Sequence, residues 1–326
     1  MSRVFVRGYG VVSPAGWGNE AFAKWLMGES AAVPTEVERP DGRRHAVMRV
    51  PALGTRAPWQ MHPRLRRASP ISHFTVASAL EAVGMAGGVT DLGRLGIVSC
   101  VLGGSVQYSR RFFGEVGVDP ATASPMLFPE TVFNAPASHL AAVLGTPARN
   151  DTCVSDETGF LSGMVMASDW LARGWVDHCL VVAAEESDWT TSEAVRLFSR
   201  SAVTSEGGAA VLLGTGGGSV ELEWVGTPRP YLRGRSRESI AEAMVAEVRG
   251  MGVEKVFGVG VGLAGVEELS ARVGSGLGAA GGWGCVAAIE GVVNGCGRTG
   301  VCVAGSNLQG LGGVFGGGVS SFKFEA

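Results

Sequence analysis

Residues 150–167 read NDTCVSDETGFLSGMVMA. The polar first half and apolar second half of this stretch predict a sharp turn into a helix from about 157 to 173, ending at Gly174. Glu157 falls in the first turn of that helix, where free N–H groups and the helix dipole favour an anion by roughly 0.3–1 kcal/mol. One interpretation of Glu157 is therefore an ordinary solvated glutamate.

The sequence on either side alternates short apolar runs with helical patterns. Apolar runs typical of strands buried on both faces lie at 95–101, 179–184, 209–213 and 256–261, and a closing strand is expected at 301–304. Helical periodicity or a terminating glycine marks 19–27, 72–85, 135–144, 240–249 and 279–293. Strands that alternate with helices predict an α/β fold with largely buried sheets.

Glycine and proline mark the expected irregular segments. A strand at 4–6 is predicted to end in a turn at 8–14, and the Pro- and Arg-rich 34–66 is predicted to be a surface excursion. The glycine-rich 312–318 is predicted to be a loop before a closing strand at 319–324, and it lacks the phosphate-binding pattern GxxxxGK[ST]. Gly214–Gly218 marks the expected boundary between an N-terminal half, 1–220, and a C-terminal half, 221–326.

The composition argues against several classes of function. The 326 residues carry a net charge of −3, which gives no reason to expect nucleic-acid binding or electrostatic attachment to a membrane. The apolar runs are well below the roughly 20 residues that a membrane span needs, and the N-terminus does not read as a signal peptide. The six cysteines form no C-x-x-C pair, so we expect buried reduced thiols in a cytoplasmic protein.

Further motifs along the chain carry a resemblance to a known family. They are GYGVVSPAG at 8–16, the arginine-rich turn and helix at 64–82, FPETVFN at 128–134, GWVDHCLVVAAE at 174–185, GSGLGAAG at 274–281 and SNLQGLGG at 306–313. With residues 150–167 they resemble the β-ketoacyl synthases, the condensing enzymes of fatty-acid and polyketide synthesis. The resemblance implies a thiolase-like α/β fold of two pseudo-related halves in α-β-α-β-α layers, here with a shortened C-terminal half.

The resemblance places Glu157 where the family carries its nucleophilic cysteine. Asn134 lies 23 positions earlier, which matches the family's spacing from asparagine to nucleophile. Catalysis needs a thiolate that forms an exchangeable thioester, and a carboxylate cannot replace it. The carboxylate of Glu157 is then expected to fill the vacant nucleophile pocket and to bond helix N–H groups.

The two histidine positions of the family are also changed. Val259 and Ser275 stand in these places, and all five histidines of the chain lie at or before residue 178. Losing one oxyanion donor alone costs about 10²–10³ in rate, and valine donates no hydrogen bond. We therefore predict that the chain has no catalytic residues and no condensing activity of its own, and that it uses neither a metal nor a cofactor.

This pattern resembles the chain-length factor, the inactive partner of a ketosynthase in heterodimeric type II polyketide synthases. The resemblance implies that the chain pairs with an active ketosynthase and shapes the acyl tunnel, in polyketide or related fatty-acid-like biosynthesis. Many chain-length factors carry glutamine at the Glu157 position. The glutamate, the missing histidines and the short C-terminal half resemble instead the partners in polyene-making systems, of the aryl polyene or highly reducing type.

The same resemblance implies tunnel and interface candidates. Leu127 lies seven positions before Asn134, where the family places a side chain that crosses the dimer interface; a plain core leucine is the alternative. Tyr108, Phe112 and Phe113 are candidates for a helix that lines the tunnel, with a packed aromatic stripe as the alternative. Five arginines either attract an acidic carrier protein or form a solvated face: Arg64, Arg66, Arg67, Arg110 and Arg111.

Two other functions stay open. One is decarboxylation of malonyl-carrier protein, which needs the histidine pair that Val259 and Ser275 replace. The other is a homodimeric acyl-binding pseudo-ketosynthase, since ketosynthase-like folds are dimers. The expected partners are an active ketosynthase and, through it, an acyl carrier protein whose phosphopantetheine the partner subunit uses. Neither nucleic-acid binding nor membrane insertion is expected.

Overall fold

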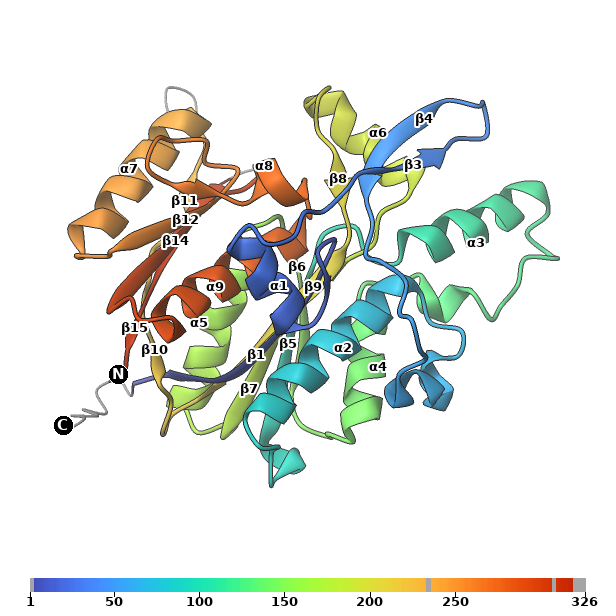
Figure 1. Cartoon of the computed structure of the whole chain (residues 1–326). Coiled ribbons are helices and arrows are strands. Elements are labelled where there is room, and N and C mark those ends of the chain that lie inside the picture. The colour runs from blue at the N-terminus through green and yellow to red at the C-terminus, as the bar shows by residue number, and fades with distance from the viewer. Residues whose placement is uncertain (1–2, 233–235, 307–308, 319–326) are drawn as a thin grey trace.

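The computed structural model describes residues 3–232, 236–306 and 309–318. Two sets of five strands form one continuous sheet (Figure 1). In the N-terminal half the strand order is β1 (Phe5–Ser13), β9 (Gly207–Gly214), β7 (His178–Glu185), β5 (Leu95–Val101) and β6 (Asn150–Val154). In the C-terminal half the order is β10 (Val220–Val225), β15 (Gln309–Gly317), β14 (Arg298–Ala304), β12 (Lys255–Val259) and β13 (Glu267–Glu268).

The two halves repeat the same strand directions. In each half the first two ladders are antiparallel and the last two are parallel. The halves join where β1 pairs with β10, with Val6 opposite Val220, and β2 (Gly16–Trp17) and β11 (Arg229–Pro230) attach to this sheet. The expected pair of pseudo-related halves is therefore confirmed. The boundary expected after residue 220 lies at the first residue of β10.

Helices fill the space between the two halves of the sheet and cover both outer faces (Figure 1). α5 (Gly159–Ala172) and α9 (Gly278–Val293) pack against each other in the middle layer. α2 (Pro70–Met85) and α4 (Ala135–Leu144) lie on the outside of the N-terminal half, and α7 (Arg237–Gly250) lies on the outside of the C-terminal half. This is the α-β-α-β-α arrangement that the sequence predicted.

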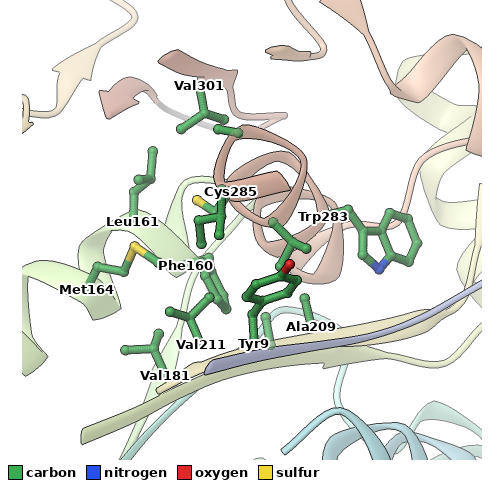
Figure 2. Packing of buried hydrophobic residues seen from close by; sticks show 14 of the residues in the cluster. Tyr9, Phe160, Leu161, Met164, Val181, Ala209, Val211, Trp283, Cys285 and Val301 are labelled. Carbon is green, nitrogen blue, oxygen red and sulfur yellow. The ribbon is translucent and has the colours of Figure 1, made fainter. Parts of the chain in front are cut away.

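The middle layer holds the main hydrophobic core. Figure 2 shows Phe160 of α5 and Trp283 of α9 packed above strand residues that include Tyr9. The indole Nε1 of Trp283 donates to the carbonyl of Val12 at 3.1 Å, so the buried ring also ties α9 to β1. α9 is buried on almost every side, which explains its glycine- and alanine-rich sequence: only small residues let one helix touch both halves.

The remaining elements are short and lie at the surface. They are the helices α1 (Asn19–Leu26), α3 (Val106–Val118), α6 (Trp189–Phe198) and α8 (Ser270–Val273), and the 3₁₀ turns η1 (Pro58–Met61), η2 (Pro63–Leu65), η3 (Leu92–Arg94) and η4 (Phe128–Glu130). Within the described ranges, no helix combines the length and the apolar composition that crossing a membrane requires. The helices predicted near 19–27, 72–85, 135–144, 240–249 and 279–293 are confirmed.

The turn predicted at 8–14 is wrong, because β1 continues through it to Ser13. Gly8 and Gly10 are the reason. A Cβ at either position would overlap a carbonyl oxygen of α2, that of Ala82 or that of Ser78 respectively. These glycines let the helix lie directly on the strand, which continues through one irregularity in its pairing with β9, between Val6 and Gly8.

The surface excursion expected at 34–66 is largely exposed, as predicted, but it holds two short strands, whereas the loop expected at 312–318 needs correction. The surface excursion at 34–66 contains β3 (Thr35–Glu38) and β4 (Arg44–Met48), which form a small separate sheet with β8 (Thr204–Ser205). The loop expected at 312–318 is largely the strand β15, whose glycines make room for α7: a Cβ at Gly312 would lie 3.0 Å from Val248. The strand expected at 319–324 lies outside the described residues.

Candidate functional site

Glu157 lies in the turn between β6 and α5 and is buried, with 6% of its surface exposed. α5 begins at Gly159, two residues later than the sequence predicted. The interpretation of Glu157 as a solvated surface residue is therefore wrong. A Cβ at Gly281 of α9 would overlap the carbonyl oxygen of Glu157, so the turn is pressed directly against the middle helix.

The loop after β14 holds the turn from the other side. The backbone N–H of Ser306 donates to Oε2 of Glu157 at 2.7 Å. Nε2 of Gln309 donates to Oγ1 of Thr158 at 3.0 Å, and this hydroxyl in turn donates to Asp156 at 2.7 Å. The expected bonds from N–H groups of α5 to the carboxylate are replaced by bonds from Ser306 and from the backbone of Glu157 itself.

The carboxyl group of Glu157 is held in an environment that disfavours its charge. Burial raises its pKa above the ordinary value, and the neighbouring charge of Asp156 acts in the same direction. The hydrogen bonds from the backbone of Glu157 and from Ser306 oppose this shift without cancelling it. The group can therefore hold a proton at a higher pH than a surface glutamate does.

A second buried carboxyl group, that of Glu185, completes the acidic centre. Glu185 ends β7 and accepts hydrogen bonds from the backbone N–H groups of Leu102, Gly103 (2.9 Å) and Gly278. Gly278 is the first residue of α9, and a Cβ there would lie 2.7 Å from Oε1 of Glu185. Burial raises the pKa of Glu185 to about 8, and the charge of Glu157 contributes to the shift.

Sequence reasoning noted Glu185 only as the end of a motif. Its role in the centre was missed because the sequence does not show that the end of β7 meets the start of α9. The available signal was a glutamate at the end of a fully apolar strand, where a charged residue is rarely buried unless it has partners. We refer to Glu157 and Glu185 together as the acidic pair.

The two expected histidine positions lie around the same helix. Val259 is buried at the end of β12, and its Cγ2 lies 3.0 Å from where a Cβ at Gly284 of α9 would be. Ser275 precedes α9 by three residues, and its backbone N–H donates to the carbonyl of Val203 at 2.8 Å. α9 therefore contacts Glu157 and Val259, and Ser275 lies just before its first residue.

The start of α9 is a strained turn. Leu277 has a φ of 47°, the one positive φ of a non-glycine residue in the described part of the chain. A leucine in this region is a genuine outlier that the surrounding structure has to enforce. Its Cδ1 lies 4.0 Å from where a Cβ at Gly103 would be, on the loop that donates to Glu185. The strain therefore lies next to the acidic pair.

The tunnel and interface candidates lie on α3, just before η4 and at the start of α4, where Phe113 and Asn134 are exposed and Tyr108 and Phe112 are half-buried. α3 has no buried residue, so Tyr108, Phe112 and Phe113 do not belong to the core. The ring of Phe112 contacts those of Phe113 and Phe128, with centroids 5.4 and 5.6 Å apart. Leu127 is buried, which agrees with a core leucine.

Large apolar side chains gather along α3, η4 and the segment that leads to α4. We call this the α3–η4 surface. Asn134 is exposed at the start of α4 and lines a cavity of about 630 Å³ together with Asn150 and Val154 of β6. β6 is an outer strand, and among the described residues it pairs only with β5. The surface comprises Phe113, Val118, Met126, Phe128, Val132 and Phe133, all of them exposed.

The five arginines proposed for a carrier protein fall into two groups. Arg64, Arg66 and Arg67 lie exposed in and just after η2. Arg110 donates to the carboxylate of Asp188, and Arg111 donates to that of Glu115 at 3.3 Å. The two arginines of the second group are therefore paired with carboxylates of the same chain.

Comparisons with known proteins agree with this architecture. No family model and no curated protein matches the sequence. A solved structure of the ishigamide ketosynthase/chain length factor superposes with a TM-score of 0.81 at 17% identity, over 97% of this chain and 99% of that one. The chain has the thiolase-like ketosynthase fold.

Other solved structures of this fold are similar over the same length. A β-ketoacyl synthase from Burkholderia phymatum STM815 has a TM-score of 0.79 at 16% identity, covering 98% of this chain and 100% of that one. The complex of the ketosynthase ApeO with its chain length factor ApeC from Xenorhabdus doucetiae gives 0.75 at 12% identity, over 97% and 98% of the two chains. Identities this low show that the fold is shared. They do not show that residues at matching positions have the same role.

Proposed function

We propose that this protein is a non-catalytic chain-length factor that pairs with an active ketosynthase. The observation that carries the proposal is the buried Glu157 at the turn before α5, held by the N–H of Ser306 and by contact with Gly281. Solved structures of the same fold include a ketosynthase in complex with its chain length factor, which supports such a pairing here.

The chemistry of the three positions supports the absence of a condensing activity. A carboxyl group at 157 forms no exchangeable thioester. Val259 offers no hydrogen bond to a developing oxyanion, and the backbone of Ser275 is engaged with Val203 and Ser205. Decarboxylation of malonyl-carrier protein needs the pair of imidazoles that Val259 and Ser275 replace, so no observation favours that alternative.

The α3–η4 surface is the proposed site of the partner. A contiguous exposed apolar surface on a folded chain is typical of an interaction site. The unpaired edge of β6 lies beside it, along the cavity that Asn134 and Val154 line. In this proposal Phe112, Phe113 and Tyr108 of α3 line the shared tunnel, Leu127 supports them from the core, and Asn134 lies at the interface.

The proposal extends to the kind of product and to the location. Glu157 and the two lost histidines favour a polyene-making system of the aryl polyene or highly reducing type. The carrier protein is expected to act through the partner subunit, whose cysteine would receive the acyl group from phosphopantetheine. A cytoplasmic location fits a complex that works on carrier-bound intermediates.

Isolation of the tagged chain from its native cells tests the proposal. Intact mass spectrometry of the co-purifying protein is expected to show a ketosynthase with an active-site cysteine in a one-to-one complex. The complex, and neither subunit alone, is expected to extend an acyl group with malonyl-carrier protein. A lone homodimer would contradict the proposal and favour an acyl-binding protein, and carbon dioxide release by the isolated chain would favour a decarboxylase.

A further inference from the structure

Two cysteines lie directly opposite each other on neighbouring parallel strands. Cys100 of β5 is the register partner of Cys153 of β6. Neighbouring strands lie about 4.7–4.9 Å apart, and side chains opposite each other in a ladder project from the same face. This spacing falls within the range of about 4.4–6.8 Å between the Cα atoms of disulfide-bonded cysteines.

Both thiols face α5, and glycines leave room for them there. Sγ of Cys100 donates to the carbonyl of Gly159 at 3.3 Å, and a Cβ at Gly163 would lie 2.8 Å from the same sulfur. Cys153 is half-buried and packs against the main hydrophobic core, to which Cys100 belongs. The two thiols interact, since each shifts the pKa of the other.

The two thiols differ in burial and in pKa. Thiol exchange needs one accessible thiol that ionises readily and a second thiol beside it. The interaction with the neighbouring Cys100 lowers the pKa of Cys153 to about 7, against the effects of partial burial and of Asp151. The contact with Cys153 and complete burial raise the pKa of Cys100. One thiol is thus accessible and readily ionised, and the other is buried and held beside it.

The remaining cysteines lack this arrangement. Cys179, Cys285 and Cys302 are buried, and burial raises the pKa of each thiol. Cys296 is half-buried in the turn after α9, outside any described strand. It serves as a control because it is also half-buried and has no opposing cysteine in a described ladder.

We propose that Cys100 and Cys153 form a reversible disulfide by exchange with a low-molecular-weight disulfide such as oxidised glutathione. The thiolate of Cys153 attacks one sulfur of the oxidant, which forms a mixed disulfide and releases one small thiol. Cys100 then loses its proton and attacks the sulfur of Cys153, which releases the second small thiol. One oxidant disulfide is reduced to two thiols while the two protein thiols are oxidised to one disulfide.

The bond would tie the outer strand β6 to β5 four residues before Glu157. The turn that carries Glu157 starts where β6 ends, so the bond would limit the motion of the acidic pair's first member. The inference does not depend on the proposed function, because it rests on the ladder between β5 and β6 alone.

Native full-length protein in glutathione buffers of stepped composition tests this site. Exchange is stopped with acid, free thiols are then blocked by alkylation of the denatured protein near neutral pH, and peptides are mapped by mass. The expected result is the loss of two thiols and one linked peptide pair that contains Cys100 and Cys153. Six free thiols at every composition, or a linkage between other cysteines, would overturn the proposal.

Single variants show which cysteine attacks the oxidant first, and whether oxidation is specific to this pair of cysteines. Cys100→Ala is expected to stop at the mixed disulfide and to carry one glutathione on Cys153, while Cys153→Ser carries none and forms no linkage. Cys296→Ser is expected to oxidise like the unmodified chain. Circular dichroism confirms folding, and mapping of the unmodified chain decides the question if a variant misfolds. Because Cys100→Ala also removes the neighbour that lowers the pKa of Cys153, this variant is oxidised at about pH 9, where an ordinary thiol is ionised. A Cys100→Ala chain free of glutathione under that condition would overturn the assignment of Cys153 as the attacking thiol.

Discussion

The backbone N–H of Ser306 donates to the carboxylate of Glu157 across 149 positions of sequence, at 2.7 Å. The bond joins the loop that follows β14 in the C-terminal half to the turn that precedes α5 in the N-terminal half. The side chain of Glu157 thereby links the two halves of the fold.

Restoring the nucleophile alone is expected not to restore condensation. Glu157→Cys places a thiol at the turn, but Val259 and Ser275 still supply no imidazole for decarboxylation or for the oxyanion. We expect no product from the isolated variant with acyl- and malonyl-carrier proteins, measured by intact mass of the carrier. Glu157→Gln is the control of similar size, and turnover by the cysteine variant above that control would show that the histidine positions are not needed.

The acidic pair makes folding stability depend on pH in a defined direction. The folded pKa of Glu185 is about 8, above its ordinary value of 4.5, so the unfolded chain releases this proton first. Its contribution to stability is full below 4.5 and is lost as pH rises toward about 8. Urea unfolding across this window is expected to show a smaller loss with Glu185→Gln than with the unmodified chain.

A variant outside the acidic pair checks that assignment. Asp151→Asn changes an exposed carboxyl group on β6 and is expected to keep the loss of stability seen in the unmodified chain. An identical pH profile for Glu185→Gln and the unmodified chain would mean that Glu185 is ionised throughout the range.

The contact between α9 and the turn leaves no room for a side chain at 281. Gly281→Ala would force a Cβ into the carbonyl oxygen of Glu157, which is backbone and cannot rotate away. We expect a loss of about 1–3 kcal/mol or more in the free energy of unfolding, measured by urea denaturation.

Gly114→Ala is the matched control for that substitution. Gly114 lies in the exposed helix α3, and a Cβ there would meet nothing within 4 Å. Alanine favours the helix over glycine by up to about 1 kcal/mol, so this variant is expected to be as stable as the unmodified chain or more so. Equal stability of the two variants would refute the proposed close contact at 281.

The α3–η4 surface predicts where a charge disrupts pairing with the ketosynthase. Phe128 is 55% exposed, so Phe128→Asp is expected to leave the fold intact while it weakens the heterodimer at least about tenfold. Phe198→Asp is the control, since Phe198 is 93% exposed at the end of α6 and outside that surface. Calorimetric titration of each variant with the purified partner measures the effect, and equal weakening by both variants would point to a different interface.

Local patterns in the sequence were enough to predict much of the fold. Apolar runs such as 95–101 and helical periodicity such as 279–293 reflect burial along a single element, and they identified the main strands and helices. The glycine-rich strands β1 and β15 were misread. Their glycines are needed because helices α2 and α7 pack closely on these strands. The local sequence does not show which helix packs on a strand.

Residue identity alone was enough to show that position 157 carries a carboxyl group and that no histidine follows residue 178. Only the tertiary structure decided that Glu157 is buried against α9, that Glu185 joins it, and that Cys100 lies opposite Cys153. The physical reason is that residue identity sets which chemistry is possible, whereas pKa shifts and thiol pairing depend on strand register and burial. These arise from contacts between segments far apart in the chain.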